Sequence, residues 1–316
     1  AARIRRGEGT KAKDKTAPVD PHTRITERIL ADLEAGVRPW LKPWSAERLA
    51  GRVTRPLRAT GEPYRGINVV LLWMEAVACG YASSTWLTYR QAQALGGQVR
   101  KGEKGAPVVY YGTSSKNRTD EQSGEEREEG FRFLKSYTVF NTEQVEGLPE
   151  GFGQSGDCLP RSDIERIAEA EAWFARLPAE VRHGGDRAFY TIGEDRIQMP
   201  PFEAFDVAYG YYSTRGHETL HWTRHPTRLD RSFGRKAWGD EGYAREELCA
   251  ELGAAFLAAD LGLAIEPRAD HAAYIGSWVQ VLRNDRRAIV QAAAHAERAV
   301  AYLHTLAKPA AQQEAA

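Results

Sequence analysis

Two histidines four residues apart, in the segment "RGHETLHWTRHP" (215–226), constrain the fold of this chain more than any other feature. In an α-helix, side chains at positions i and i+4 lie on the same face, one turn apart. His217 and His221 can therefore direct two imidazoles at one metal ion, and Glu218 can reach a water molecule on that ion. This is the H-E-x-x-H arrangement, in which the glutamate is the general base of a zinc hydrolase. The segment predicts a helix that carries a zinc site; the alternative is a polar helix with solvated histidines.

A third histidine, His225, follows in the same segment. It lies about 12 Å from His217 along a helix axis, too far for two ligands that must each lie ~2 Å from one zinc ion. Pro226 also disfavours helical geometry at the preceding residue. A zinc-protease pattern with a third histidine six residues after the second would need one at position 227, which is Thr227. His225 is therefore predicted to end the helix rather than to bind metal.

The third ligand is expected in the segment "REELCAELGAAFL" (245–257). Glu247 and Glu251 lie one turn apart there, beside an apolar helix face, where carboxylates are costly unless they meet a cation or a donor. We expect Glu247 to be the third zinc ligand and Glu251 to accept a hydrogen bond from His217. The reverse assignment and simple surface salt bridging remain alternatives.

A zinc hydrolase also needs a group that stabilises the oxyanion. Tyr243, just before the second helix, is the candidate, and Arg245 is another. Ordinary packing and surface roles are the alternatives for both. The predicted hairpin at 187–199 could offer an edge strand that a peptide substrate extends.

The rest of the chain predicts a mixture of helices and short strands. The alternating, aromatic segment 131–141 predicts a strand that pairs with the apolar run 107–111, and the acidic stretch 113–130 is expected to be an exposed loop. We therefore expect an α+β fold, a small α+β domain followed by a mostly helical one. Helical spacing of apolar residues predicts helices at 22–36, 66–79, 88–95, 162–176, 203–224, 241–261, 269–282 and 285–306.

The length of 316 residues is sufficient for two domains. Glycine and proline are concentrated between the two halves, and such a composition is typical of a linker. The expected organisation is a disordered basic arm at 1–20, a first domain at 21–147, a linker at 148–161, a second domain at 162–307 and a disordered tail at 308–316.

Charge is distributed unevenly along the chain. The whole sequence carries 43 basic and 43 acidic residues, so the overall charge predicts no polyanionic partner. Residues 1–110, however, carry 19 Lys and Arg against 10 Asp and Glu. A regional basic surplus suits a domain that contacts phosphates.

Three scattered cysteines, Cys79, Cys158 and Cys249, form no C-x-x-C pair. This pattern argues against a disulfide framework and against a cysteine zinc site, and it suits a reducing compartment. No apolar run is long enough to cross a membrane, and the N-terminus lacks the apolar segment of a secretory signal. We therefore expect a cytoplasmic protein with no membrane partner.

The zinc motif and the helix after it resemble those of gluzincin-like peptidases, in which a downstream glutamate is the third ligand. Over residues 22–307 the chain resembles the ArdC-type antirestriction proteins of conjugative plasmids, which are related to the N-terminal part of TraC-type primases. The resemblance implies a domain that binds single-stranded DNA, a zincin-like metallopeptidase domain, and protection of incoming DNA from host restriction. The segments that carry it are "YRGINVVLLW" (64–73), "WLTYRQAQALGGQVRKGEKGAPVVYYG" (86–112), "FLKSYTVFNTEQVEGLP" (133–149) and "YIGSWVQVLRNDRRAIVQAAAHAERAVAYL" (274–303).

Residues of the first domain support DNA binding independently. Single-stranded DNA is held by a positively charged groove and by aromatic rings on which bases stack. The glycine-flanked turn "RKGEKG" (100–105) and nearby aromatic residues suit this role; the alternative is a solvated turn, with Trp86 in the core. The candidate DNA-binding residues are Arg65, Trp86, Tyr89, Arg90, Arg100, Lys101, Lys104 and Lys135.

The sequence thus predicts a protein that binds single-stranded DNA without strong sequence preference and holds one Zn²⁺ ion through His217, His221 and Glu247. Glu218 would activate water for hydrolysis of an unknown protein substrate, of which a host restriction component is one candidate. The alternative is a non-enzymatic DNA-binding protein whose zinc is structural or vestigial, but Glu218 would have no task there. A primase or nuclease is not indicated, because the sequence shows no acidic cluster of the two-metal type and no cysteine zinc ribbon.

Overall fold

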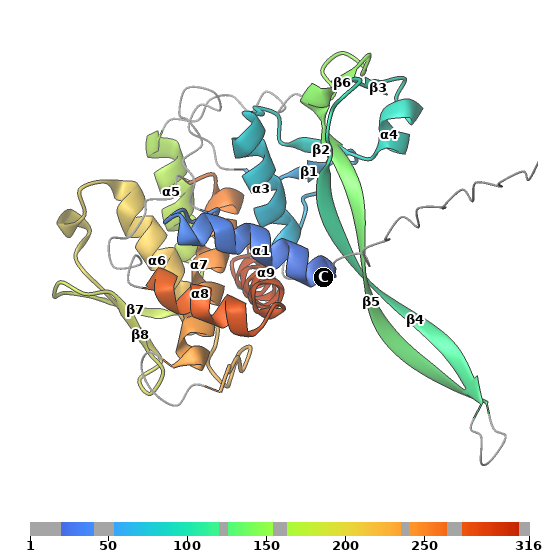
Figure 1. Cartoon of the computed structure of the whole chain (residues 1–316). Helices are drawn as coiled ribbons and strands as arrows, with labels where there is room; N and C mark the ends of the chain where they lie inside the picture. Colours follow the sequence, from blue (N-terminus) through green and yellow to red (C-terminus); the bar gives the residue numbers. More distant parts are fainter. Residues whose placement is uncertain are drawn as a thin grey trace, which may run out of the picture.

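The computed structural model describes residues 20–40, 54–119, 126–153, 163–234, 240–263 and 274–309 (Figure 1). Outside the described residues lie the predicted arm apart from Asp20, most of the predicted linker and tail, Cys158, and the first part of the predicted helix 269–282. The described residues combine helices with small sheets, which confirms the predicted α+β class. Among them, no helix is both long and apolar enough to span a membrane.

The first half of the chain is built on a four-stranded sheet. Its strands are β1 (Leu57–Arg58), β2 (Thr85–Leu87), β4 (Ala106–Thr119) and β5 (Glu126–Asn141), and β3 (Gln98–Val99) and β6 (Val145–Glu146) form a separate pair. The order is β1-β2-β5-β4, and β5 runs antiparallel to both of its neighbours. Val108 lies opposite Tyr137, so the predicted pairing of 107–111 with 131–141 is confirmed.

The acidic stretch 113–130 was predicted to be a loop, and this prediction is wrong for 113–119 and 126–130, whereas 120–125 lie outside the described residues. β4 and β5 stay paired as far as Thr119 opposite Glu126, and the resulting hairpin projects from the rest of the molecule (Figure 1). Backbone hydrogen bonds between the two strands define a two-stranded ribbon, so its sequence needs no apolar alternation.

The three helices predicted in the first half are all observed. The first begins after Asp20, whose carboxylate accepts a hydrogen bond from the backbone N–H of Thr23 at 3.1 Å. The third begins after Thr88, which forms a capping box with Gln91. These side chains satisfy N–H groups that the first turn of a helix leaves unpaired. The helices are α1 (Pro21–Glu34), α3 (Ile67–Cys79) and α4 (Tyr89–Ala94).

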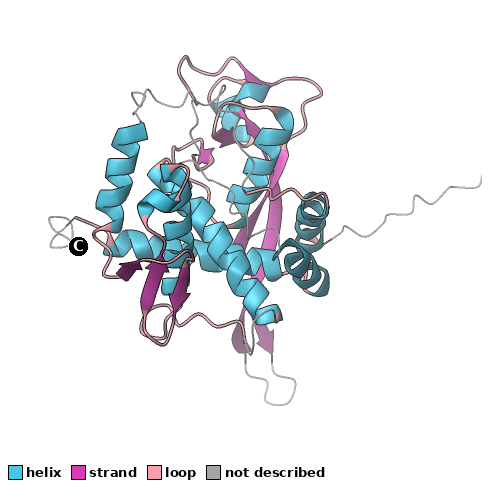
Figure 2. Cartoon of the chain, turned by 90° about the vertical axis from the view of Figure 1, so that its left-hand side faces the viewer, coloured by secondary structure: helices cyan, strands magenta, loops and turns pink. Residues whose placement is uncertain are grey.

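The second half is mostly helical, with a three-stranded sheet beside the helices (Figure 2). Its elements are α5 (Asp163–Phe174), β7 (Glu180–His183), β8 (Phe189–Thr191), β9 (Arg196–Met199), α6 (Ala208–Trp222), α7 (Glu241–Leu261), α8 (Ile275–Asn284) and α9 (Ala288–Leu306). The predicted hairpin is observed as β8 and β9, and β7, which was not predicted, pairs in parallel with β9. The predicted helix 203–224 begins only at Ala208: Phe202–Ala204 form a short 3-10 helix, and the chain is extended at Phe205 and at Val207.

One hydrophobic cluster runs through both halves of the chain. It includes Ile29 of α1, Phe256 of α7 and Ile289 of α9, all fully buried. Trp40, shortly after α1, packs edge-on against Trp278 of α8 with ring centroids 5.8 Å apart. The first half is therefore held against the helices of the second half by a shared core.

A buried arginine adds polar contacts between the halves. Arg55 donates hydrogen bonds to both oxygens of Asp260, at 2.6 and 2.9 Å, and to Glu297 at 2.7 Å. Burial lowers the pKa of Arg55, but the two carboxylates outweigh this effect and raise it above its ordinary value. Arg55 therefore stays charged and ties the segment before β1 to α7 and α9.

Helices α6 and α7 approach each other closely at Gly253. A Cβ added at Gly253 would lie 2.5 Å from Cδ1 of Leu220, which is fully buried on α6. Because Gly253 has no side chain, the backbone of α7 can lie directly against Leu220. This contact sets the distance between the helix that carries both histidines and the helix that carries the candidate glutamates.

We expect Gly253→Ala to lower the free energy of unfolding by about 1–3 kcal/mol, because overpacking forces buried groups apart. The metal affinity should fall as well, since α6 and α7 would separate. Denaturant unfolding and a metal titration measure the two effects. Gly276→Ala is the matched control: it lies in α8, where an added Cβ meets nothing within 4 Å. Equal effects of the two substitutions would contradict the packing argument.

Candidate metal centre

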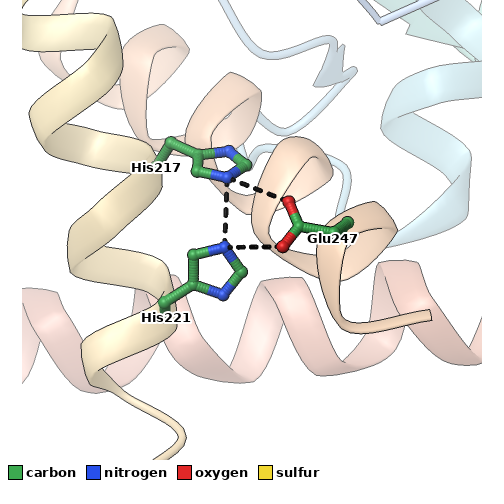
Figure 3. Close-up of side chains that lie close together, drawn as sticks. All are labelled: His217, His221 and Glu247. Carbon is green, nitrogen blue, oxygen red and sulfur yellow. Dashed lines mark hydrogen bonds and ion pairs between the residues drawn. The ribbon is translucent and has the colours of Figure 1, made fainter. Parts of the chain in front are cut away.

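Three buried side chains from two neighbouring helices converge in the second half of the chain (Figure 3). His217 and His221 lie one turn apart on α6, and Glu247 lies on α7. The Nε2 atoms of the histidines are 3.1 Å apart, and each lies 3.5 Å from an oxygen of Glu247. Among the described residues, these three form the group whose ligand atoms are close enough to share a metal ion.

The spacing of the ligand atoms fits a tetrahedral metal site. At zinc–ligand distances of about 2.0–2.1 Å, two tetrahedral ligands lie roughly 3.3 Å apart. The observed separations of 3.1 and 3.5 Å lie on either side of this value. Glu247 faces the Nε2 atoms of both histidines, whereas Glu251 approaches Nδ1 of His217 at 3.6 Å. The geometry therefore favours Glu247 over Glu251 as the third ligand.

Each histidine also has a glutamate of α7 on its other side. Glu251 lies beside Nδ1 of His217, at 3.6 Å. Glu246, which the sequence analysis missed, has Oε1 3.1 Å from Nδ1 of His221. Carboxylates in this position hold the ring orientation and the tautomer that leaves Nε2 available to a metal. The only sequence signal for Glu246 is its place next to Glu247.

Glu246 is itself held by a buried arginine. Arg231 donates hydrogen bonds to Oε1 and Oε2 of Glu246, at 2.7 and 2.9 Å. Arg231 also donates to the backbone carbonyl of Leu220 and to the hydroxyl of Thr223, both at 2.9 Å. The segment after α6 therefore folds back and fixes the carboxylate that orients His221.

Burial and neighbouring charges shift the pKa values of these residues in opposite directions. Burial lowers the pKa of His221, but the carboxylates of Glu247 and Glu246 outweigh it and raise the pKa to about 10. Burial raises the pKa of Glu247, but His221 and His217 outweigh it and hold the pKa well below its ordinary value. Glu246 shows the same balance: burial raises its pKa, and Arg231 and His221 lower it by more. Both carboxylates are therefore ionised at neutral pH, which suits a cation.

Glu218 and His225 occupy different surroundings. Glu218 directly follows His217 on α6 and is 4% exposed, so it is buried next to a candidate ligand. His225 lies beyond the end of α6, where Nδ1 is 2.8 Å from the hydroxyl of Thr227. His225 is thus part of a local turn and lies outside the group of ligand atoms.

Tyr243 lies beside the candidate centre, and Arg245 does not. Burial raises the pKa of Tyr243 well above its ordinary value, and the charge of Glu247 raises it further. The Tyr243 hydroxyl is 2.8 Å from that of Tyr274. Arg245 is instead paired with Asp285 at 3.0 Å. Of the two candidates for stabilising an oxyanion, the geometry favours Tyr243.

Arg38, which belongs to the first half of the chain, reaches the same region. Its Nη1 is 3.3 Å from Oε1 of Glu251, and its side chain is 13% exposed. Because Glu251 lies against His217, the first half supplies an outer contact to a candidate ligand. The sequence analysis missed this contact, because no local pattern relates Arg38 to a helix more than two hundred residues away.

We expect Arg38→Ala to weaken metal binding about tenfold, at the lower end of the effect of losing an outer-shell partner. The reason is that Glu251 loses the donor that holds it against His217. Competition with a chelating fluorophore measures the affinity. Arg28→Ala is the control, since Arg28 pairs with Glu75 of α3. A loss of affinity of the same size in both variants would contradict the specific role of Arg38.

The candidate DNA-binding residues other than Trp86 lie at four places in the first half. Arg65 is exposed just before α3, and Lys135 is exposed on β5. Arg100 is paired with Glu103 at 2.7 Å. The residues on α4 and on the turn between β3 and β4 are exposed, namely Tyr89, Arg90, Lys101 and Lys104.

Trp86 does not belong with these residues. It is 1% exposed, and its ring packs edge-on against Tyr81 at 5.8 Å between centroids. A base can stack only on an exposed ring, so the prediction of a DNA contact is wrong for Trp86. Exposed aromatic residues that the sequence analysis missed lie on the β4–β5 hairpin, namely Tyr110, Tyr111 and Tyr137.

Both halves match known families. Residues 20–140 match the model of the N-terminal domain of the anti-restriction factor ArdC. Residues 168–295 match the model of a zincin-like metallopeptidase, and this range contains His217, His221 and Glu247.

Two related proteins show how far the likeness extends. An uncharacterised protein, y4eC, of Sinorhizobium fredii is 42% identical over 303 residues, which cover 94% of this chain and 95% of that protein. A DNA primase TraC of Escherichia coli is 40% identical over 298 residues, which cover 88% of this chain but only 26% of the primase. The chain thus corresponds to about a quarter of that primase.

Solved structures agree with these matches over nearly the whole chain. The metal-free crystal structure of the antirestriction ArdC protein from plasmid R388 has a TM-score of 0.76 at 46% identity, covering 91% of this chain and 98% of that one. The Mn(II)-bound structure of the same protein has a TM-score of 0.74 at 42% identity, covering 92% and 99%. On this evidence the chain belongs to the family of ArdC-type antirestriction proteins.

Proposed function

We propose that this protein binds single-stranded DNA with its first half and hydrolyses peptide bonds at a metal centre in its second half. Together these activities would protect the DNA of a mobile element from host restriction. The observation that carries the catalytic part is the convergence of His217, His221 and Glu247, with Glu218 buried next to them. The described cysteines form no disulfide, which supports a reducing, cytoplasmic location.

We infer that the resident ion is Zn²⁺. Two imidazoles and one carboxylate are the donor set of many catalytic zinc sites. The R388 relative has been crystallised with Mn(II), so Mn²⁺ is expected to bind to the same donors in this chain. When bound, such an ion supplies a Lewis acid and makes a water molecule more acidic.

Each of the other steps would be carried out by residues of the chain. His217, His221 and Glu247 hold the ion. Glu218 takes a proton from the attacking water and passes it to the leaving amine, as a general base and then a general acid. Tyr243, like any tyrosine of ordinary pKa, keeps its proton at neutral pH, and its raised pKa favours the protonated form further, so its hydroxyl can donate a hydrogen bond to an oxyanion.

The position of β8 supports a peptide as the substrate. In the sheet order β7-β9-β8, β8 is an edge strand, and it packs against α6, which carries both histidines. An extended peptide can pair with such an edge through its backbone. The substrate backbone would then run beside the metal centre.

Removal and return of the metal tests the catalytic proposal. The wild-type protein is incubated with a peptide library, and new termini are identified by mass spectrometry. We expect a chelator to abolish cleavage, and Zn²⁺ or Mn²⁺ to restore it. Cleavage that persists in the chelator, or wild-type protein that binds neither ion, would refute the proposal.

DNA binding is tested by a salt titration with a fluorescent oligothymidylate. The match to the ArdC N-terminal domain and the exposed basic and aromatic residues of the first half support this part of the proposal. Affinity should fall steadily as salt rises, because lysine and arginine contacts release counterions from the phosphates. No binding at low salt, or a preference for duplex, would contradict it.

A non-enzymatic protein with a structural or vestigial zinc ion is the alternative. Both proposals require the same three ligands, so metal content does not separate them. They differ in the role of Glu218, which a structural site does not need.

A further inference from the structure

We propose that one face of the β4–β5 hairpin, formed by Tyr110, Phe133, Lys135 and Tyr137, is the platform on which bases of single-stranded DNA stack. We call these four residues the hairpin face. The inference rests on the proposed DNA binding and gives it a location. None of the three aromatic residues was among the candidates that the sequence suggested.

The register of the hairpin places the four side chains on the same side. Tyr110 of β4 lies directly opposite Lys135 of β5, and side chains of directly opposed residues share a face. Phe133 and Tyr137 lie two residues before and after Lys135, so strand alternation puts them on that face as well. The ring centroids of Tyr110 and Phe133 are 6.4 Å apart.

A glycine allows Phe133 to lie across the hairpin. Gly112 is the residue opposite Phe133, and a Cβ added there would lie 2.2 Å from the ring carbon Cζ of Phe133. The ring therefore covers the position that a side chain at 112 would occupy. The ammonium group of Lys135 lies 4.8 Å from the centroid of the same ring. The result is an aromatic cluster with a cation on it, in which the planes of the Tyr110 and Phe133 rings are inclined by 58°.

The hairpin face is exposed and continues toward a second cation. Tyr110 is 58% exposed and Tyr137 is 37% exposed, so both rings are accessible to a ligand. Tyr137 lies beside buried Tyr64 and contributes to raising the pKa of that residue, and the Tyr64 ring lies 5.3 Å from the guanidinium carbon of Arg58. Arg58 is exposed, so a second cation lies at the start of the sheet, near this end of the hairpin face.

The opposite face of the hairpin is engaged by α1. Arg24 donates a hydrogen bond to the hydroxyl of Ser136 at 2.8 Å, and the ring of His22 lies 6.1 Å from that of Tyr111. Val109, on this side, is 5% exposed. In the part of the chain that the structure describes, no helix covers Tyr110 on the hairpin face in this way.

The chemistry of the hairpin face favours single-stranded nucleic acid over a protein partner. Rings take up bases without regard to sequence, and interspersed cations contact the phosphates between them. Between Val108 and Gly112 on β4 and between Phe133 and Tyr137 on β5, alternation places no acidic residue on this face. A duplex keeps its bases stacked within the helix, so its bases could not stack on these rings.

Tyr110→Ala and Tyr111→Ala form a matched pair of variants. The two tyrosines are adjacent, with exposed fractions of 58% and 49%, but they lie on opposite faces of the hairpin. Fluorescence anisotropy with labelled oligothymidylate measures binding. Loss of one stacking ring should weaken binding about 5- to 150-fold for Tyr110→Ala. Tyr111→Ala should bind like the wild type, and Tyr110→Phe should retain affinity because it keeps the ring.

Two further variants test the arrangement without removing Tyr110. Gly112→Val should displace the ring of Phe133 and weaken binding. Lys135→Ala should reduce the slope of log affinity against log salt by roughly 0.7, the value for one phosphate contact on a single strand. Thermal unfolding of each variant shows whether the hairpin remains folded.

The outcomes separate this inference from the function on which it rests. If the wild type binds no single-stranded DNA, the proposed DNA binding itself fails. If the wild type binds and the Tyr110→Ala and Gly112→Val variants bind equally well, DNA binding stands and the hairpin face is wrong. Unchanged DNA binding with loss of self-association would instead mark the face as a protein interface, which also overturns the inference.

Discussion

Replacement of His217 by alanine is expected to leave the purified protein with almost no bound metal. The three candidate ligands lie within one buried group, and two remaining ligands cannot complete the protein side of a catalytic zinc site. Glu247 would also lose one of the two imidazoles that hold its carboxylate. Elemental analysis of wild type and variant measures the metal content, which should fall from about one ion per chain to near zero.

The same substitution should remove the stabilisation that the metal provides. An ion present at about 1,000 times its dissociation constant stabilises the folded state by about 4 kcal/mol. Added Zn²⁺ should therefore raise the midpoint of thermal unfolding of the wild type, but not that of the His217→Ala variant. His225→Ala is the control, because His225 lies in the turn after α6 and outside the group of ligand atoms. A His217→Ala protein that still binds one ion would show that the site lies elsewhere.

Glu218→Gln should abolish hydrolysis and keep the metal. Glutamine has nearly the same shape but cannot accept a proton at neutral pH, and loss of a general base typically slows a reaction by about 10²- to 10⁴-fold. Glu218 is not one of the three candidate ligands, so zinc content and DNA binding should match those of the wild type. Mass spectrometry of new protein termini in cells that carry either form gives the readout. Glu75→Gln is the control, since Glu75 pairs with Arg28 of α1.

This variant also decides between the two proposed functions. If Glu218→Gln retains metal and DNA binding but loses cleavage and antirestriction, the peptidase carries the function. If the variant protects incoming DNA as well as the wild type does, the non-enzymatic alternative is correct.

Most helices could be predicted from the sequence because helix formation leaves a local pattern. Apolar spacing is enough to locate α1, whose residues Ile25, Ile29, Leu30 and Leu33 are buried on one face. The hairpin shows the limit of this approach. Most residues of its outer part, up to Thr119 opposite Glu126, are polar or charged, and such a sequence has no pattern that separates a strand from a loop. Trp86 shows a second limit. It was a candidate for DNA contact because it is aromatic, but the residue type alone does not reveal whether its ring is buried.

The candidate metal centre could likewise be predicted only in part. His217, Glu218 and His221 are defined by spacing within one helix, so helix geometry alone brings the two imidazoles together. On α7, however, Glu246, Glu247 and Glu251 are all close enough in sequence to be ligands.

The sequence by itself therefore determined the zinc motif, the α+β class and the position of most helices, because each depends on residues a few positions apart. Only the tertiary structure decided which glutamate faces both Nε2 atoms and which two lie beside the Nδ1 atoms. That choice depends on how α7 lies against α6 at Gly253. It also depends on two arginines from other segments of the chain: Arg231 contacts Glu246, and Arg38 contacts Glu251. Contacts between residues so far apart in the chain leave no local pattern, so they appear only once the helices are packed.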